Sequence, residues 1–310
     1  MAFNHHYPLL IASLFLLSTL IVPSTASGTA RKLSQGQQQQ PMTTLSYHKG
    51  PLLKGNITAH ITWYGKFTPS QRAILLDFIQ SLRLHIPAPS VPSWWKMTEK
   101  YKGGYTNLIL GKQTIDNTYS LGKSLKSPHI LRFARRGEHQ GSISVVFTAK
   151  DVVVDGFCMN NCGSHGTGKT SKSAKTKFPY IWVGNPETQC PGECAWPFHQ
   201  PIYGPQSPPL IPPNGDVGVD GMIINFATLL AGTVTNPYDN GYYQGPSTAP
   251  LEAVSACTGI YGKGAFPGYP GQLLVDKTTG ASYNAIGIHG RKYLLPAMWD
   301  PKTSACTTLV

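Results

Sequence analysis

Acidic residues are scarce in this chain of 310 amino acids, which contains 14 Asp and Glu against 26 Lys and Arg. The formal net charge is therefore +12, and every Lys, Arg, Asp and Glu lies beyond residue 30. A surface of this kind attracts polyanions such as acidic polysaccharide or acidic lipid. A positive charge that serves only solubility is the alternative, and composition does not decide between the two.

Long apolar runs are also missing near the start of the chain, apart from the block from Tyr7 to Val22. This block is shorter than the roughly 20 apolar residues that cross a bilayer, and small residues follow it up to Ser27. The pattern predicts a signal peptide over residues 1–27, cleaved near Ser27 or Ala30, with an uncleaved anchor as the alternative. We therefore expect a secreted, extracellular protein with no membrane span and no nucleic acid partner.

Apolar periodicity is absent from residues 28–43, which are polar and include the run Gln37–Gln40. Such a segment cannot bury enough apolar surface to fold, so we expect disorder there. The remaining residues, 44–310, interleave strand and helix patterns without strict alternation or internal repeats. We therefore expect one α+β domain with a mixed sheet and helices.

Three segments carry the clearest periodicity. Residues 57–64 alternate apolar and polar side chains, the two-residue period of a strand, with His60 on the polar face. Thr68 and Gln71 form a capping box for a helix that ends near Leu82. The segment Asp220–Val234 is almost wholly apolar, as a buried helix would be. Further strands are expected at 107–110, 142–147, 180–183, 273–275 and 293–295, a short helix carrying buried Trp94 and Trp95 after Ser93, and loops at 163–177 and 201–213.

The cysteines form an even set of six, which predicts disulfides in an oxidising compartment. We expect Cys257 to pair with Cys306, and Cys158, Cys162, Cys190 and Cys194 to pair among themselves. Because the last four form two Cys-x3-Cys motifs, a structural zinc site is the alternative. Separately, Asn56 begins the one N-glycosylation sequon of the chain, which predicts an exposed, glycosylated asparagine.

Sequence motifs for enzyme chemistry are weak or missing. Residues 163–170 match the phosphate-loop pattern GxxxxGK[ST], but no apolar helical stripe follows them. A working phosphate loop precedes a helix whose amide groups face the phosphates, so we reject nucleotide binding. No GxSxG motif is present, and the sequence identifies no nucleophile.

Several distant motifs, in order, resemble the EXORDIUM, or phosphate-induced protein, family of plants. They are Tyr180–Asn185, Cys190–Phe198, Asn214–Met222, Gly232–Pro237 and Gly290–Pro296. The resemblance covers residues 45–310. It implies a protein of the apoplast and cell wall that is linked to cell expansion and growth responses, with no firmly established biochemical activity and no cofactor.

Some relatives in this family resemble zinc peptidases, because an HExxE-like helix precedes their Thr-x-Thr-Asn-Pro stretch. In this chain the matching positions are Thr228 to Gly232, and they contain neither His nor Glu. Thr228, Leu229 and Gly232 therefore occupy degenerate metal-helix positions, since zinc needs about three protein ligands. The resemblance implies a fold that is zincin-like, without bound metal.

Two classes of function follow. The first is a non-catalytic wall or signalling protein that binds acidic polysaccharide or a cell-surface receptor, with a binding cluster of lysines. These are Lys169, Lys172, Lys175 and Lys177. The second is a secreted hydrolase with an unconventional site built from His165, Glu252 or His199. We expect the first, with no catalytic residues.

Overall fold

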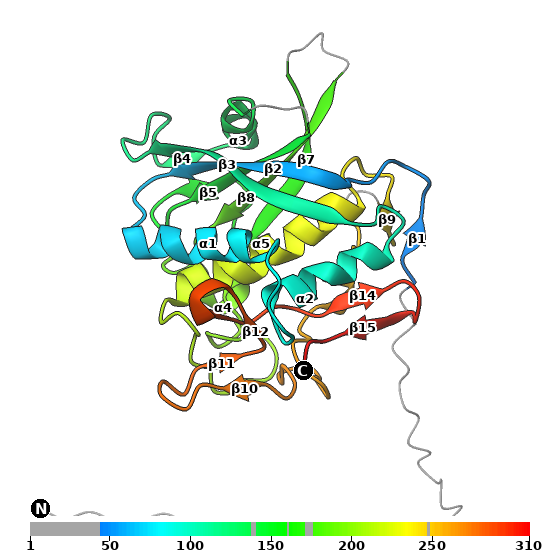
Figure 1. Ribbon diagram of the computed structural model, residues 1–310. Helices are drawn as coiled ribbons and strands as arrows, with labels where there is room; N and C mark the ends of the chain where they lie inside the picture. The colour runs from blue at the N-terminus through cyan, green and yellow to red at the C-terminus, as the bar shows by residue number, and fades with distance from the viewer. Residues whose placement is uncertain (1–43, 138–140, 160, 171–175, 247–248) are drawn as a thin grey trace, which may run out of the picture. The chain divides into compact units, whose positions relative to one another are not determined.

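The computed structural model describes residues 44–137, 141–159, 161–170, 176–246 and 249–310 (Figure 1). The expected signal peptide and the polar segment 28–43 lie outside the described residues. Lys172 and Lys175 of the predicted lysine cluster do so as well.

A five-stranded mixed sheet organises the described part of the chain, with strands in the order β3-β2-β5-β8-β7. Neighbouring pairs among the first four strands are parallel, whereas β7 runs antiparallel to β8 at one edge. The strands are β2 (Gly55–Tyr64), β3 (Thr106–Asp116), β5 (Ser142–Thr148), β7 (Gly163–Lys169) and β8 (Lys177–Gly184). Together with the helices, this mixed sheet confirms the expected α+β class.

Helices cover the two faces of this sheet unequally (Figure 1). On one face, named here the α5 face, lie α1 (Pro69–Ser81), α2 (Val91–Trp95), α4 (Pro191–Cys194) and α5 (Val217–Thr235). On the opposite face, the α3 face, lies the short helix α3 (Ser127–Ala134). Most of the hydrophobic core therefore lies between the sheet and the helices of the α5 face.

The two clearest sequence patterns form as expected. Ile57 and Ile61 of β2 are buried, and the intervening Thr58 and His60 are only half-buried. Thr68 accepts a hydrogen bond from the Gln71 backbone N–H, and the Gln71 side chain completes the capping box. The apolar stripe of α1 then packs into the core, which is the burial that stabilises an amphipathic helix.

The helix α5 begins at Val217, three residues earlier than the apolar run predicts, because Asp216 caps it by accepting from the Val219 backbone N–H at 2.9 Å. Among the described helices, α5 is long and apolar enough to span a membrane by length and composition. Most of it is buried inside the fold, where it packs against β7 and β8. Its apolar character therefore serves the core.

Short strands and single helical turns make up the rest. They are β1 (Ser46–Tyr47), β4 (Ser124–Leu125), β6 (Val153–Val154), β9 (Tyr242–Tyr243), β10 (Leu274–Val275), β11 (Ser282–Tyr283), β12 (Ala285–Ile286), β13 (Lys292–Tyr293), β14 (Met298–Asp300) and β15 (Ala305–Thr307), with 3-10 turns at Lys96–Lys100, Ser255–Cys257 and Ile288–Gly290. Trp94 and Trp95 are buried, and their indole N–H groups donate to backbone carbonyls.

All six cysteines are paired. Cys257 bonds to Cys306, as predicted, and the other bonds are Cys158–Cys190 and Cys162–Cys194. The four cysteines of the two short motifs therefore pair among themselves, each bond joining one motif to the other. No thiolate is left for a structural zinc, so the zinc alternative is wrong.

The expectation of a loop over residues 163–177 is wrong for its first part, which is the edge strand β7. Side chains do not identify this strand, since its sequence is GSHGTGK. Close packing explains its glycines instead, because a Cβ on Gly163 would lie 2.4 Å from the Trp182 carbonyl oxygen. Glycine is therefore required where β7 closely approaches its neighbours.

Candidate functional site

A buried histidine and a buried glutamate meet between β7 and α5. His165, on β7, lies with its Nε2 2.7 Å from Oε2 of Glu252. The two side chains are only 9% and 10% exposed. The other carboxylate oxygen of Glu252 accepts a hydrogen bond from the Asn236 side chain at 2.7 Å. We call these three residues the His165–Glu252–Asn236 chain.

Local backbone structure fixes the glutamate end of this chain. Asn236 is the residue that ends α5, and its side-chain oxygen accepts from the Gly241 backbone N–H at 2.7 Å. The backbone N–H of Glu252 donates to the Ser255 hydroxyl at 2.8 Å. The Glu252 carboxylate and the Asn236 amide that donates to it are therefore both held in place by hydrogen bonds with the neighbouring chain.

Gly232 of α5 gives the pair its space. A Cβ at this position would lie 2.5 Å from Oε2 of Glu252 and 3.1 Å from Nε2 of His165. A contact of 2.5 Å is shorter than any normal packing distance, so a side chain here would displace the pair. The space beside Gly232, one of the degenerate metal-helix positions, is thus filled by the His165–Glu252 pair.

The charge state of His165 is set by competing effects. Burial disfavours the imidazolium, but the hydrogen bond and the charge of Glu252, with a contribution from Asp239, raise the pKa of His165 above its ordinary value. Its Nδ1 is buried, and it has no hydrogen-bond partner among the described residues. The imidazole therefore interacts with Glu252 through one nitrogen and is shielded at the other.

A cavity of about 630 Å³ opens beside this pair. His165, Glu252, Thr228, Leu229, Asp239 and Ser255 contribute to its wall. A general base must have a free nitrogen or oxygen within hydrogen-bond reach of its substrate. In His165, Glu252 occupies Nε2 and Nδ1 is enclosed. The geometry is that of a hydrogen-bonded His–Glu pair in the wall of a cavity.

The degenerate metal-helix positions do not fit zinc. The Thr228 hydroxyl donates to the Ile224 carbonyl within the helix at 2.9 Å, Leu229 is apolar, and Gly232 has no side chain. Across the residues that the structure describes, no group of three or more His, Cys, Asp or Glu side chains is placed to hold a metal ion. Two residues, His165 and Glu252, do not supply the roughly three ligands of a catalytic zinc site.

The third residue of the hydrolase alternative lies elsewhere. His199 is exposed, with its Nδ1 2.9 Å from the Gln200 carbonyl oxygen, and it does not line the cavity. The structure thus brings together His165 and Glu252 but not His199. Sequence spacing could not predict this contact, because His165 and Glu252 are 87 residues apart and no spacing rule connects them.

The described members of the lysine cluster stand at the outer end of the β7–β8 hairpin. Lys169 and Lys177 are both exposed and lie directly opposite each other in the antiparallel pairing. The Arg135 guanidinium donates to the Lys169 carbonyl at 2.9 Å, which places a third cation at this end of the hairpin. Asn56, the predicted glycosylation site, is exposed at the start of β2.

Comparison with known proteins gives the family. The model of the phosphate-induced protein 1 conserved region matches residues 45–309. Protein EXORDIUM-like 2 of Arabidopsis thaliana is 58% identical, over all of this chain and all of that protein. Protein PHOSPHATE-INDUCED 1 of Nicotiana tabacum is 60% identical over 91% of this chain and 93% of that protein.

Protein EXORDIUM of Arabidopsis thaliana is 56% identical over 97% of this chain and 99% of that protein. No solved structure matches the chain significantly. None of these three relatives has an enzymatic name. With a family model that matches nearly the whole described part of the chain, this protein belongs to the EXORDIUM and phosphate-induced protein family.

Proposed function

We propose that this protein is a secreted, non-catalytic component of the plant cell wall space that binds acidic polysaccharide and acts in cell expansion and growth signalling. Plant relatives of high identity support the setting, and the net charge of +12 supports a polyanionic ligand. The enclosed imidazole of His165 supports a role without catalysis. A cell-surface receptor with an acidic face is the alternative partner.

The observation that carries the proposal is the pairing of Lys169 with Lys177. Like charges directly opposite each other in a ladder destabilise the pairing of two strands. Folding alone therefore does not favour two lysines at this register, and Arg135 adds a further cation nearby. A polyanion that lies across the end of the hairpin would relieve this repulsion and gain from all three charges.

Retention on de-esterified pectin tests this proposal. We expect the protein to bind and to elute with rising salt, because the Debye length falls from about 10 Å at 0.1 M to about 3 Å at 1 M. In the test variant, four lysines of the predicted cluster become glutamine, namely Lys169, Lys172, Lys175 and Lys177. This variant should elute at clearly lower salt.

The matched control removes the same number of charges from exposed lysines outside the hairpin. These are Lys54, Lys66, Lys263 and Lys277, again changed to glutamine. Equal elution of test and control variants would mean that net charge alone, and not the hairpin, retains the protein. Methyl-esterified pectin, which lacks most of the charge, should retain none of the three proteins.

A secreted hydrolase is the second candidate function, and the cavity beside His165 and Glu252 is the observation that favours it. Elemental analysis of protein purified without chelators, paired with a proteolysis assay, separates the two candidates. We expect no stoichiometric zinc and no activity that a chelator abolishes. One zinc per chain, together with proteolytic activity that is lost on chelation, would establish the hydrolase instead.

A further inference from the structure

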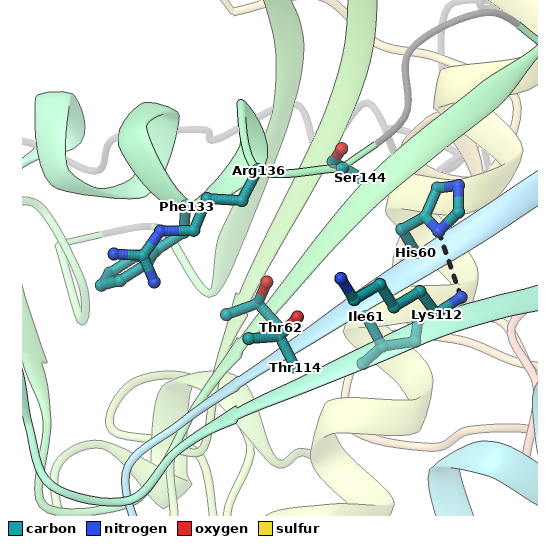
Figure 2. Close-up of a pocket in the computed structure, with 9 residues that line it drawn as sticks. His60, Ile61, Thr62, Lys112, Thr114, Phe133, Arg136 and Ser144 are labelled. Carbon is teal, nitrogen blue, oxygen red and sulfur yellow. Dashed lines mark hydrogen bonds between the residues drawn. The ribbon is translucent and has the colours of Figure 1, made fainter.

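A second, smaller cavity lies on the α3 face of the sheet (Figure 2). Its volume is about 80 Å³. Strand β2 contributes His60 and Thr62, β3 contributes Lys112 and Thr114, and β5 contributes Ser144 to its wall. Arg136, just after α3, completes the wall from the other side. The floor is thus made of three adjacent strands, which makes it rigid.

Two permanent cations, Arg136 and Lys112, line this cavity. Arg136 lies over the Phe133 ring, with its guanidinium carbon 5.0 Å from the ring centroid, and this contact orients the group. Lys112 reaches in from the β3 side, and its ammonium points to the same side of the sheet as the hydroxyls of Thr62 and Thr114 (Figure 2). Both cations are exposed, so a ligand can reach them from solvent.

Neither Lys112 nor Arg136 forms a salt bridge among the described residues. The side chains of the wall include no carboxylate there. Asp116, further along β3, accepts hydrogen bonds from the hydroxyls of Ser120 and Thr118, and it lies near enough to Arg136 for the two charges to attract each other. The ion pairs of the described chain involve other cations, for example Lys100 with Asp300 and Arg291 with Asp77. Lys112 therefore has no acidic partner among the described residues, and Arg136 is balanced only in part, by the charge of Asp116.

Hydrogen-bond donors accompany the charge. His60 Nδ1 accepts the Lys112 backbone N–H at 3.1 Å, which leaves Nε2 as the protonated nitrogen of the neutral ring. The Ser144 hydroxyl is already used, because it donates to the Ala134 carbonyl at 2.8 Å and ties the end of α3 to β5. Thr62 and Thr114 add hydroxyl groups that can donate to an anion.

The size of the cavity limits the ligand. A space of this volume holds on the order of a few water molecules, so it accepts a compact oxyanion but not a sugar ring. A carboxylate on a longer chain fits this description, since the charged group enters and the rest of the molecule stays outside. Arginine suits such a group, because its planar fork donates two parallel hydrogen bonds to one carboxylate.

We propose that this cavity binds a single carboxylate of an acidic polysaccharide, held by Arg136 and Lys112. The proposal rests on the proposed function and deepens it, because it assigns a specific subsite distinct from the lysines of the hairpin. The hairpin supplies diffuse attraction to a polyanion. The cavity supplies recognition of one free acid group and rejects its methyl ester, which has no charge.

Isothermal titration with short galacturonic acid oligomers tests the subsite. The wild-type protein should bind the free-acid oligomer and bind its full methyl ester at least tenfold more weakly. The double variant Arg136→Gln/Lys112→Gln should lose about tenfold in affinity for the free acid and nothing for the ester. The control Arg83→Gln/Lys263→Gln removes two other exposed charges and should bind as the wild type does. Thermal unfolding of each variant checks that it is folded.

Three outcomes would overturn the inference. If the double variant and the control lose affinity equally, the cavity has no specific part in binding. If sodium acetate at low concentration displaces the oligomer, the site takes a free small anion and not a polysaccharide group. If the cavity variant binds normally while the hairpin variant does not, this inference fails and the proposed function stands. Loss of pectin retention in the wild type itself would instead refute the proposed function.

Discussion

Polar side chains have different partners on the two faces of the central sheet. On the α5 face, His165 binds Glu252, and Glu252 also accepts from Asn236, so both carboxylate oxygens have partners within the fold. On the α3 face, Lys112 and Arg136 border a cavity and form no salt bridge among the described residues, and Arg136 is balanced only in part by Asp116. Polar groups of the first kind stabilise a structure, whereas those of the second kind are available to a ligand.

The largest expected effect comes from filling the space at Gly232. Gly232→Glu should destabilise the protein by about 4 kcal/mol or prevent folding, because the new side chain meets the buried pair. Gly232→Ala should cost about 2 kcal/mol, although alanine is favoured over glycine in a helix by about 1 kcal/mol. Urea unfolding of the purified variants measures both.

A double variant shows whether the buried pair is the cause. Removing the carboxylate in Gly232→Ala/Glu252→Ala should recover part of the loss due to Gly232→Ala, so the two effects should not add. Additive effects would show that Gly232 is required for another reason. The clash also predicts that Thr228→His/Leu229→Glu/Gly232→Glu gains at most weak zinc affinity, since the fold around the new ligands is disturbed and their supporting hydrogen bonds are missing.

Neighbouring residues of β2 offer the next test, because they point to opposite faces. Ile61 is buried on the α5 face, and truncation to alanine should cost about 3 kcal/mol. Thr62 lines the cavity of the α3 face, and Thr62→Ala should cost less than about 1 kcal/mol while it weakens binding of the free-acid oligomer. Unfolding and titration on the same two variants separate stability from binding. Equal losses of stability would contradict the division between the faces.

The sequence predicts these two faces to different extents. The alternation in β2 and the capping box of α1 were visible, because apolar periodicity and local hydrogen bonds are written in neighbouring residues. The strand β7 was not, because its glycines are required by close approach to β8, which no local pattern reports. The predicted pairing of Cys257 with Cys306 is confirmed, although six cysteines allow 15 connectivities and their number alone does not select it.

The candidate sites depend on tertiary contacts, so the sequence revealed only their parts. His165 and Glu252 were named as separate candidates, and their hydrogen bond follows from the meeting of β7 with the segment after α5. His60 was expected on the polar face of its strand, which is where it lies. Its grouping with Lys112 and Arg136 could not be expected, because strand order brings β2, β3 and β5 together.

The smallest expected effect is the pH dependence of stability that comes from the His165–Glu252–Asn236 chain. Because the pKa of His165 is raised on folding, its contribution to stability is fully present below the ordinary histidine value of about 6.5 and is lost as pH rises through the folded pKa. One proton changes stability by at most about 1.4 kcal/mol per pH unit. The wild-type protein should therefore lose stability more steeply than His165→Gln as pH rises above about 6.5.

Urea unfolding at several pH values gives both slopes, and their difference isolates the imidazole. Other groups cancel in this difference, including Asp220, whose pKa burial raises to about 7 and whose ionisation also lowers stability as pH rises. Glutamine can still donate one hydrogen bond to Glu252, so the carboxylate keeps a partner in the variant. Parallel slopes would show that folding does not change the proton occupancy of His165 in this pH range, which would contradict the raised pKa.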